Sequence, residues 1–304
     1  MTYSEIWHRI ATSYDDGEAR AIARILIEEL FGLSYADIVC GATEQLSADD
    51  TLRLDTAVRR IEQGEPLQHV LGYADFCGNR FSVNSSVLIP RPETEWLVDE
   101  GAKLMSTTAT SSPKRILDIG TGSGCIAISL KLRLGDAYVE AWDISEEALR
   151  TAQDNADALK AEVVFRKRDA LRADNTAAPW DLIVSNPPYI CDSERSAMDD
   201  NVLLHEPHTA LFVPDDDPLR FYRAIARYAL LTLNIGGSLL FECNTRYAEA
   251  TGKMLSDMGF EEVTVSDDCF GLPRFVRGSS PSQPAAPPNP PRRGGLSYPR
   301  LRKA

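Results

Sequence analysis

The sequence predicts an α/β fold in which a doubly wound, mostly parallel sheet is preceded by a small all-helical domain and a β-hairpin linker. From residue 113 onward, short apolar runs alternate with helical stretches, and a glycine-rich turn follows the first run. Such alternation is typical of a parallel sheet with helices on both faces. Helical periodicity instead dominates the first 70 residues. The expected strands are Arg115–Ile119, Tyr138–Trp142, Glu162–Phe165, Leu182–Ser185, Ser238–Glu242 and Val263–Val265.

The first unit, residues 1–69, is expected to be helical and acidic. Ser47 offers a side-chain oxygen that can cap the first free N–H groups of a helix, and the apolar residues from Leu54 to Ile61 recur at helical spacing. A second helical pattern covers residues 18–31. The first 70 residues hold 13 acidic and 6 basic side chains, a net charge of −7.

The residues that follow predict a linker, a larger domain and a tail. Aromatic and apolar residues surround a turn at Cys77 and Gly78, which predicts a β-hairpin within residues 70–90. The α/β domain is expected over residues 91–277. Residues 278–304 are rich in proline and carry bases but no acid, so we expect a disordered tail.

Composition narrows the class of protein. At 304 residues the chain is long enough for two domains, and its 43% hydrophobic and 25% charged residues are typical of a globular protein. The net charge of −13 argues against binding nucleic acid by bulk neutralisation of phosphates. There is no apolar run of about 18 residues and no basic segment leading into an apolar one at the N-terminus. We therefore expect neither a membrane partner nor a secretory signal.

Cysteine and histidine usage points to a cytoplasmic enzyme without a metal site. The six cysteines lie at least 26 residues apart and form no C-x-x-C pair, so reduced thiols are expected rather than a zinc site or disulfides. His205 and His208 are three residues apart, but Pro207 disfavours a helix between them. We expect this segment to pack over the active site rather than to bind a metal.

The glycine-rich turn predicts a site for an adenosine-containing cofactor. Glycine lacks the Cβ that would block a ligand from the backbone. Two cofactors fit this turn. The pattern G-x-G-x-x-A is compatible with NAD. An acid just before the glycines, in the pattern D-x-G-x-G-x-G, is typical of proteins that bind S-adenosyl-L-methionine, and it favours that cofactor. The pattern consists of Asp118 followed after one residue by Gly120, Thr121, Gly122, Ser123 and Gly124.

Two further acids complete the expected cofactor site. Asp143 ends the second strand of the α/β domain, where a carboxylate can accept both hydrogen bonds from a ribose diol. Asp169 follows the third strand, so this residue or its neighbour Ala170 can meet an adenine edge. Ligands of such sheets bind at the carboxyl ends of the strands.

The most specific pattern is Asn186-Pro187-Pro188-Tyr189 at the end of the fourth strand. Proline has no N–H, so this corner presents carbonyl acceptors only, which suits a planar –NH₂ group. The Asn186 side-chain oxygen and the Pro187 backbone oxygen can each accept one of its hydrogens, beside the cofactor, and Tyr189 can pack on its flat face. An amide nitrogen is a weak nucleophile, so the site must act by positioning and by stabilising developing charge.

Other readings of the same residues remain open. A nucleic-acid amino-methyltransferase of the adenine-N6 type could use the same Asn186 geometry, although net charge disfavours it. A non-catalytic RNA- or ribosome-associated module that keeps the fold is the other alternative. The intact Asn186-to-Tyr189 segment argues against it.

Several segments give the chain a family resemblance over residues 1 to about 277. It resembles the release-factor glutamine methyltransferases, which methylate the side-chain nitrogen of glutamine in the Gly-Gly-Gln loop of peptide chain release factors. After Glu242, however, the chain lacks the glycine and glutamine typical of the family. Besides the glycine turn and the Asn-Pro-Pro-Tyr segment, the segments that carry the resemblance are Gly64-Glu-Pro-Leu-Gln-His-Val-Leu-Gly72, Val87-Leu-Ile-Pro-Arg-Pro-Glu-Thr-Glu95, Glu206-Pro-His-Thr-Ala-Leu211 and Gly271-Leu-Pro-Arg-Phe-Val276.

The resemblance implies a role for each site residue. Gly120 to Gly124 and Asp143 would bind the methionine moiety and ribose of S-adenosyl-L-methionine. Asp169 and Ala170 would contact adenine, and residues 186–189 would hold the glutamine amide. The acidic helical domain would help to bind the release factor, and no direct contact with nucleic acid is expected.

Overall fold

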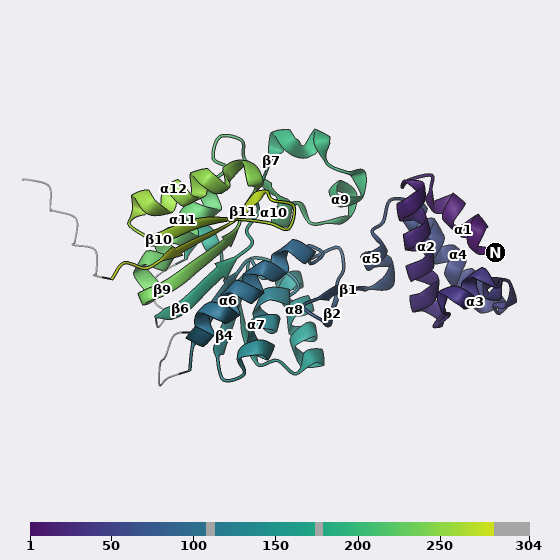
Figure 1. The fold of residues 1–304 in the computed structure, drawn as a ribbon, viewed down its shortest axis with the longest axis horizontal. Helices are drawn as coiled ribbons and strands as arrows, with labels where there is room; N and C mark the ends of the chain where they lie inside the picture. Colours follow the sequence, from purple (N-terminus) through teal and green to yellow (C-terminus); the bar gives the residue numbers. More distant parts are fainter. Residues whose placement is uncertain (108–112, 174–178, 283–304) are drawn as a thin grey trace, which may run out of the picture.

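The chain forms two units joined by a short connection (Figure 1). The computed structural model describes residues 1–107, 113–173 and 179–282. A bundle of helices lies at one end of the molecule, and a larger unit built on a twisted sheet lies at the other. The fold confirms the predicted class, a mostly parallel α/β sheet preceded by helices and a hairpin. The predicted tail beyond residue 282 lies outside the described residues.

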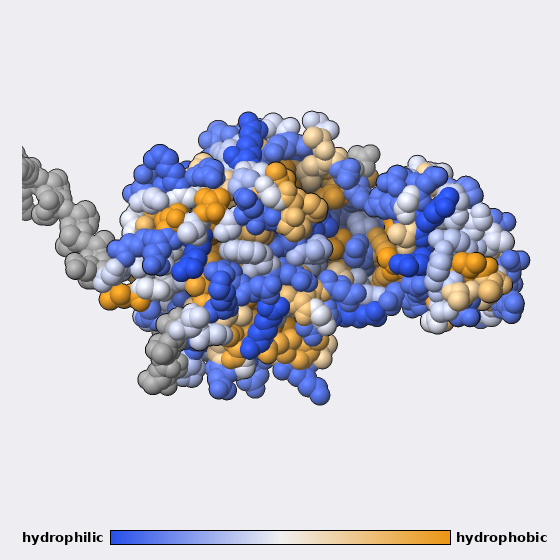
Figure 2. Space-filling view, viewed as in Figure 1, coloured by the Kyte–Doolittle hydropathy of each residue, from blue (hydrophilic) through white to orange (hydrophobic). Residues whose placement is uncertain are grey.

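The N-terminal helices form because their ends are capped and one face of each is apolar. The Asp15 side chain accepts hydrogen bonds from backbone N–H groups in the first turn of the helix that follows it. Ser47 caps a later helix, as predicted, by accepting a hydrogen bond from the Asp50 N–H. Their buried residues form one cluster that includes Ile6, Leu26 and Ile61. Figure 2 shows a mainly hydrophilic surface over this unit. The helices are α1 (Tyr3–Ile10), α2 (Asp16–Phe31), α3 (Tyr35–Val39), α4 (Ala48–Glu62) and α5 (Leu67–Leu71).

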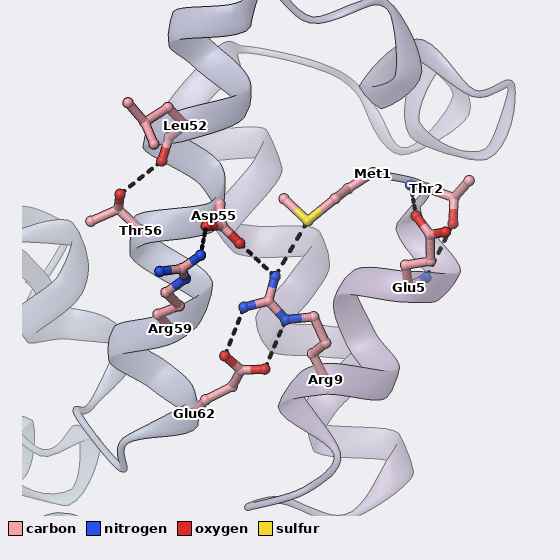
Figure 3. A network of polar contacts seen from close by, with 9 residues as sticks. All are labelled: Met1, Thr2, Glu5, Arg9, Leu52, Asp55, Thr56, Arg59 and Glu62. Carbon is pink, nitrogen blue, oxygen red and sulfur yellow. Dashed lines mark hydrogen bonds and ion pairs between the residues drawn. The ribbon is translucent and has the colours of Figure 1, made fainter.

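An ion-pair network ties α1 to α4 (Figure 3). The Arg9 guanidinium donates two hydrogen bonds to the Glu62 carboxylate, both at 2.7 Å, and one to Asp55 at 2.8 Å. Asp55 also pairs with Arg59, one turn along α4, at 2.7 Å. A planar guanidinium matches a carboxylate in this two-pronged way, so the network fixes the angle between the helices.

The predicted hairpin is present and leads into the second unit. Strands β1 (Tyr73–Phe76) and β2 (Asn79–Ser82) pair antiparallel, with Phe76 opposite Asn79. Both turn residues, Cys77 and Gly78, have positive φ, 48° and 74°. This two-residue geometry follows the right-handed twist of the strands.

The central sheet of the described residues has seven strands in the order β10-β11-β9-β6-β3-β4-β5. From β9 to β5 all neighbours are parallel, whereas β11 is antiparallel to both of its neighbours. Along the chain, β4 and β5 are added on one side of β3, and β6 and β9 are then added on the other side of β3. The switch point thus lies between β3 and β6, where sheets of this kind bind ligands. The strands are β3 (Arg115–Ile119), β4 (Tyr138–Asp143), β5 (Val163–Lys167), β6 (Trp180–Ser185), β9 (Leu233–Glu242), β10 (Glu261–Asp267) and β11 (Pro273–Ser279).

Helices cover both faces of this sheet, as predicted. One face packs against α6 (Glu95–Thr107), α7 (Cys125–Leu134) and α8 (Glu146–Leu159). The other packs against α11 (Arg220–Thr232) and α12 (Ala248–Met258), in a cluster with Trp142 and Trp180 at its centre. Shorter elements lie between β6 and α11: β7 (Ile190–Cys191), α9 (Asp200–His205), α10 (His208–Leu211) and β8 (Phe212–Val213).

Strand β11 is the main difference from the sequence prediction. Sequence patterns predict no strand there and a tail that starts at Gly278, but β11 runs through Ser279 and Ser280 is buried. The Ser280 N–H donates to the Gly237 carbonyl at 2.8 Å. A Cβ at Gly278 would lie 3.2 Å from the Cβ of Phe260, so this glycine permits close packing within the sheet unit.

Among the described helices, none has both the length and the apolar character needed to cross a membrane. All six cysteines are free thiols, three of them buried: Cys125, Cys191 and Cys243.

Candidate active site

A cavity of about 380 Å³ opens at the carboxyl ends of β3, β4 and β6. Its size suits a small-molecule cofactor. Three predicted site residues do not line it: Asp118, Gly124 and Tyr189. The ten that do are Gly120, Thr121, Gly122, Ser123, Asp143, Asp169, Ala170, Asn186, Pro187 and Pro188.

Backbone hydrogen bonds hold the glycine loop against the next strand. The N–H groups of Gly120 and Thr121 both donate to the Trp142 carbonyl at 2.9 Å. From the other side, the Asn155 amide on α8 donates to the Ser123 carbonyl at 2.9 Å. The loop is therefore a fixed floor for the cavity.

Two glycines of this loop serve different needs. Gly124 has φ +83°, and a Cβ there would lie 2.9 Å from Ile128 Cδ1 and 3.1 Å from Ala152 Cβ, so the position permits close packing of α7 on α8. Gly122 has φ +54° with no atom near its hypothetical Cβ. Because Gly122 lines the cavity, its missing side chain leaves room for a ligand to approach the backbone.

Asp118 lies beneath the loop, fully buried. It accepts a hydrogen bond from the Thr121 hydroxyl at 2.6 Å. Burial raises the pKa of this carboxyl to about 7, with the nearby Asp143 adding to the rise, against hydrogen bonds that lower it. Asp118 does not line the cavity, so it supports the loop from below. Sequence analysis instead expected this acid to help hold the ligand.

The two acids at the ends of β4 and β5 hold the backbone around the cavity. Asp143 accepts from the N–H of Gly122 and of Ser145, both at 2.9 Å, one on each carboxylate oxygen. Each oxygen keeps a second lone pair that can accept from a ligand hydroxyl. Burial raises the pKa of Asp143, and these backbone hydrogen bonds oppose the rise. Asp169 accepts from the Leu171 N–H at 2.9 Å and so caps the turn that carries Ala170.

The Asn-Pro-Pro segment lies directly beside the glycine loop. Ser185 and Ile119 are partners in the β6–β3 register, and the Ser185 hydroxyl donates to the Ile119 carbonyl at 2.6 Å. A Cβ on Gly120 would lie 3.9 Å from the Asn186 backbone oxygen. The two patterns that sequence analysis singled out, 66 residues apart, therefore meet at one end of the cavity.

Behind Asn186 lies a buried polar chain that sequence analysis missed. The Asn186 side-chain nitrogen donates to the Thr94 hydroxyl at 3.4 Å, and Thr94 donates to Glu242 at 2.7 Å. Tyr189 turns its hydroxyl to the other Glu242 oxygen at 3.2 Å, rather than lining the cavity. Burial raises the pKa of Glu242, while the hydrogen bonds from Thr94 and Tyr189 and the charge of Arg274 oppose the rise. The only sequence signal for Glu242 is that a charged residue stands at the end of a strand predicted to be buried.

The segment around His208 covers the cavity from the side, as predicted. Pro207, Thr209 and Ala210 line it. An ion pair fixes this segment: Arg91 reaches Glu206, whose side chain is 1% exposed, at 2.5 Å. Burial raises the pKa of Glu206, and the Arg91 charge opposes the rise. In the described ranges, no three potential metal ligands come together.

The fold and this cavity define an α/β methyltransferase of the class that uses S-adenosyl-L-methionine. The family described as methyltransferase small domain matches residues 95–211. A second family, described as PrmC N-terminal domain, matches residues 8–72, the helical unit and its link to the hairpin.

The chain belongs to the release factor glutamine methyltransferase family. The protein of that name from Bacteroides thetaiotaomicron is 44% identical over 264 residues, which are 86% of this chain and 93% of the relative. The Flavobacterium psychrophilum protein of the same name is 38% identical over 272 residues, 88% and 94% of the two chains. In three dimensions, the hMettl16 catalytic domain, solved with an RNA hairpin, superimposes with a TM-score of 0.52 at 18% identity, covering 78% of this chain and 83% of that one. That likeness shows the shared fold.

Proposed function

We propose that this enzyme transfers a methyl group from S-adenosyl-L-methionine to the side-chain nitrogen of the glutamine in the Gly-Gly-Gln loop of a peptide chain release factor. Two lines support the substrate: relatives of that name match most of the chain, and an acceptor-only corner lies at the cavity. The observation that carries the proposal is the place of Asn186 beside the glycine loop, at the switch point of the sheet.

The glutamine amide would bind through its two hydrogens. Asn186 offers its side-chain oxygen, and Pro187 its backbone oxygen, while neither proline can offer a competing N–H donor. Pro188 completes the wall of the corner. This arrangement leaves one face of the nitrogen for the incoming carbon and holds it at reacting distance.

The remaining cavity residues would hold the methyl donor. S-adenosyl-L-methionine supplies a methyl group activated by a positively charged sulfur. Gly120 to Gly124 and Asp143 would bind its amino acid and ribose portions, and Asp169 and Ala170 its base. The carbon–nitrogen bond would form as the carbon–sulfur bond breaks, and the nitrogen would then lose one hydrogen to solvent as a proton. Asn186 and Pro187 favour this step because their oxygens stabilise the positive charge that develops on the nitrogen.

The helical unit would contribute to recognition of the protein substrate. We assign residues 1–69 to release-factor binding and residues 70–90 to the linker, and we assign catalysis to the residues from 91 through the end of β11 at Ser279. The acidic surface of the first unit supports contact with a protein rather than with nucleic acid. Since release factors act on ribosomes, the same proposal places the enzyme in the cytoplasm.

A labelling experiment tests the proposal. The enzyme is given S-adenosyl-L-methionine with a radioactive methyl group, together with a bacterial release factor, a DNA duplex or an RNA oligonucleotide. We expect label on the release factor alone, and none when its Gly-Gly-Gln glutamine is replaced by alanine. Asn186→Ala should lower kcat by about 10²–10³-fold with little change in the cofactor Kd. Label confined to nucleic acid would instead establish the adenine-N6 type of activity.

A further inference from the structure

Asn186 is the end of a hydrogen-bond chain with a defined direction. Thr94 has one hydroxyl hydrogen and donates it to the Glu242 carboxylate at 2.7 Å. The second Glu242 oxygen receives the Tyr189 hydroxyl at 3.2 Å. With its hydrogen used, the Thr94 oxygen can only accept, so the group of Asn186 that faces it must be the –NH₂.

Secondary structure brings the two ends of this chain together. Ser185 on β6 and Phe241 on β9 are register partners, so the residues that follow them, Asn186 and Glu242, lie side by side at the carboxyl ends of these strands. Glu242 is 2% exposed and Thr94 is 3% exposed, which keeps water from competing for these hydrogen bonds.

The two residues that follow Thr94 are anchored on different elements. The Glu95 carboxylate accepts from the Cys77 N–H in the hairpin turn at 2.6 Å. The Trp96 ring stacks on Phe275 of β11, with ring centres 4.3 Å apart and planes 9° from parallel. The hairpin and the sheet thus fix the hydroxyl that faces Asn186.

We propose that Thr94 and Glu242 are positioning residues that lock the Asn186 amide so that its oxygen, not its nitrogen, faces the substrate. This inference rests on the proposed function, since it assigns the substrate group that the oxygen receives. A locked oxygen accepts a hydrogen from a glutamine amide and repels a glutamate carboxylate. Thr94, which lines the cavity, and Glu242, which does not, thereby make the corner selective for an amide by orienting Asn186.

The first test removes the hydroxyl but keeps the shape of the side chain. Thr94→Val should lower the single-turnover rate of methyl transfer to the release factor by about tenfold or more, because Asn186 then rotates freely between two orientations. Thr94→Ser keeps the hydroxyl and should stay within about threefold of the wild type. Thr251→Val is the matched control: this buried threonine lies on α12 and does not line the cavity, so its rate should be unchanged.

The second test reads the orientation of Asn186 directly. The Kd of two release factors is measured with S-adenosylhomocysteine present, one with the natural glutamine and one with that glutamine replaced by glutamate. The wild type should prefer glutamine, and Thr94→Val should reduce this preference by about tenfold, because a rotated Asn186 offers N–H groups to the carboxylate. Glu242→Gln should also reduce this preference, because glutamine has one accepting oxygen where glutamate has two, and its –NH₂ cannot accept a hydrogen bond from Thr94 or Tyr189. A general loss of structure would weaken both complexes equally and leave the ratio unchanged.

The outcomes separate the two proposals. If the wild type fails to label the glutamine of the release factor, the proposed function is wrong. If it labels that glutamine while Thr94→Val keeps the wild-type preference and rate, the enzyme is as proposed but Thr94 does not orient Asn186. Equal rate losses in Thr94→Val and Thr94→Ser would also refute the positioning role.

Discussion

Replacing Asp118 by asparagine should reveal the free-energy cost of keeping an ionised carboxyl beneath the glycine loop. The pKa of this group is about 7 in the folded protein, against an ordinary value of 3.8. Between these two values the folded state holds a proton that the unfolded state has lost, so wild-type stability falls as pH rises from 4 to 7 and levels off above 7. The asparagine side chain carries no such charge, and the Asp118→Asn variant should not show this fall.

The expected size follows from the two pKa values. Between pH 5 and pH 9, ionisation of Asp118 lowers the free energy of unfolding of the wild type by roughly 3 kcal/mol. The Asp118→Asn variant has no such contribution. Asparagine can still accept the hydrogen bond from Thr121, which is 2.6 Å away in the wild type. Any loss from altered hydrogen bonding appears at both pH values, so it cancels when the two are compared.

Urea unfolding of both proteins without cofactor, at pH 5 and pH 9, measures this quantity from the midpoints and slopes. The stability of Asp118→Asn relative to the wild type should rise by roughly 3 kcal/mol between the two pH values. Asp257→Asn, with a side chain that is 64% exposed, controls for the substitution itself. A difference below about 0.5 kcal/mol, no larger than at an ordinary surface site, would refute the account of Asp118 given above.

Four other substitutions test the packing around the site and within the N-terminal bundle. Gly124→Ala should cost about 2–4 kcal/mol by urea unfolding, from a strained backbone plus overpacking, whereas Gly122→Ala should cost only the backbone share of about 1–2 kcal/mol. Arg9→Lys should lower stability by about 0.5–1 kcal/mol, and less at high salt, because lysine cannot make the paired contacts of this partly exposed guanidinium. Arg91→Ala leaves the buried Glu206 carboxyl unpaired, so thermal melts should show a loss of about 3–5 kcal/mol at pH 8. That loss should shrink as pH falls, since protonating Glu206 removes the buried charge; a pH-independent loss would contradict it.

Sequence patterns predicted the parts of this fold that depend on neighbours along the chain. The bounds of β3 agree with the predicted strand, Ser47 caps a helix as expected, and the turn at Cys77 and Gly78 has the positive φ values of a two-residue hairpin. Each depends on local sequence: a short apolar run, a capping oxygen, or a turn residue.

What the sequence could not predict depends on contacts between distant segments. Thr94 reaches Glu242 across 148 residues, and no periodicity or motif encodes that pairing. Strand β11 was missed because glycine and serine at its end resemble the start of the tail, although both pack against the sheet. Tyr189 was expected on the substrate amide, but its hydroxyl turns toward the buried Glu242.

The place of β11 in the sheet bears on how the protein emerges from the ribosome. Residues 273–279 are synthesised after every other strand of the described sheet, yet they form an inner strand between β10 and β9. Until these residues leave the exit tunnel, the edges of β9 and β10 that pair with β11 have no partner and stay open to other chains. The apolar core of the N-terminal bundle is made entirely from residues 1–71, so the bundle can assemble first. Completion of the catalytic half therefore waits until residues 273–279 are made, and chains cut short before residue 273 would release an unfinished sheet.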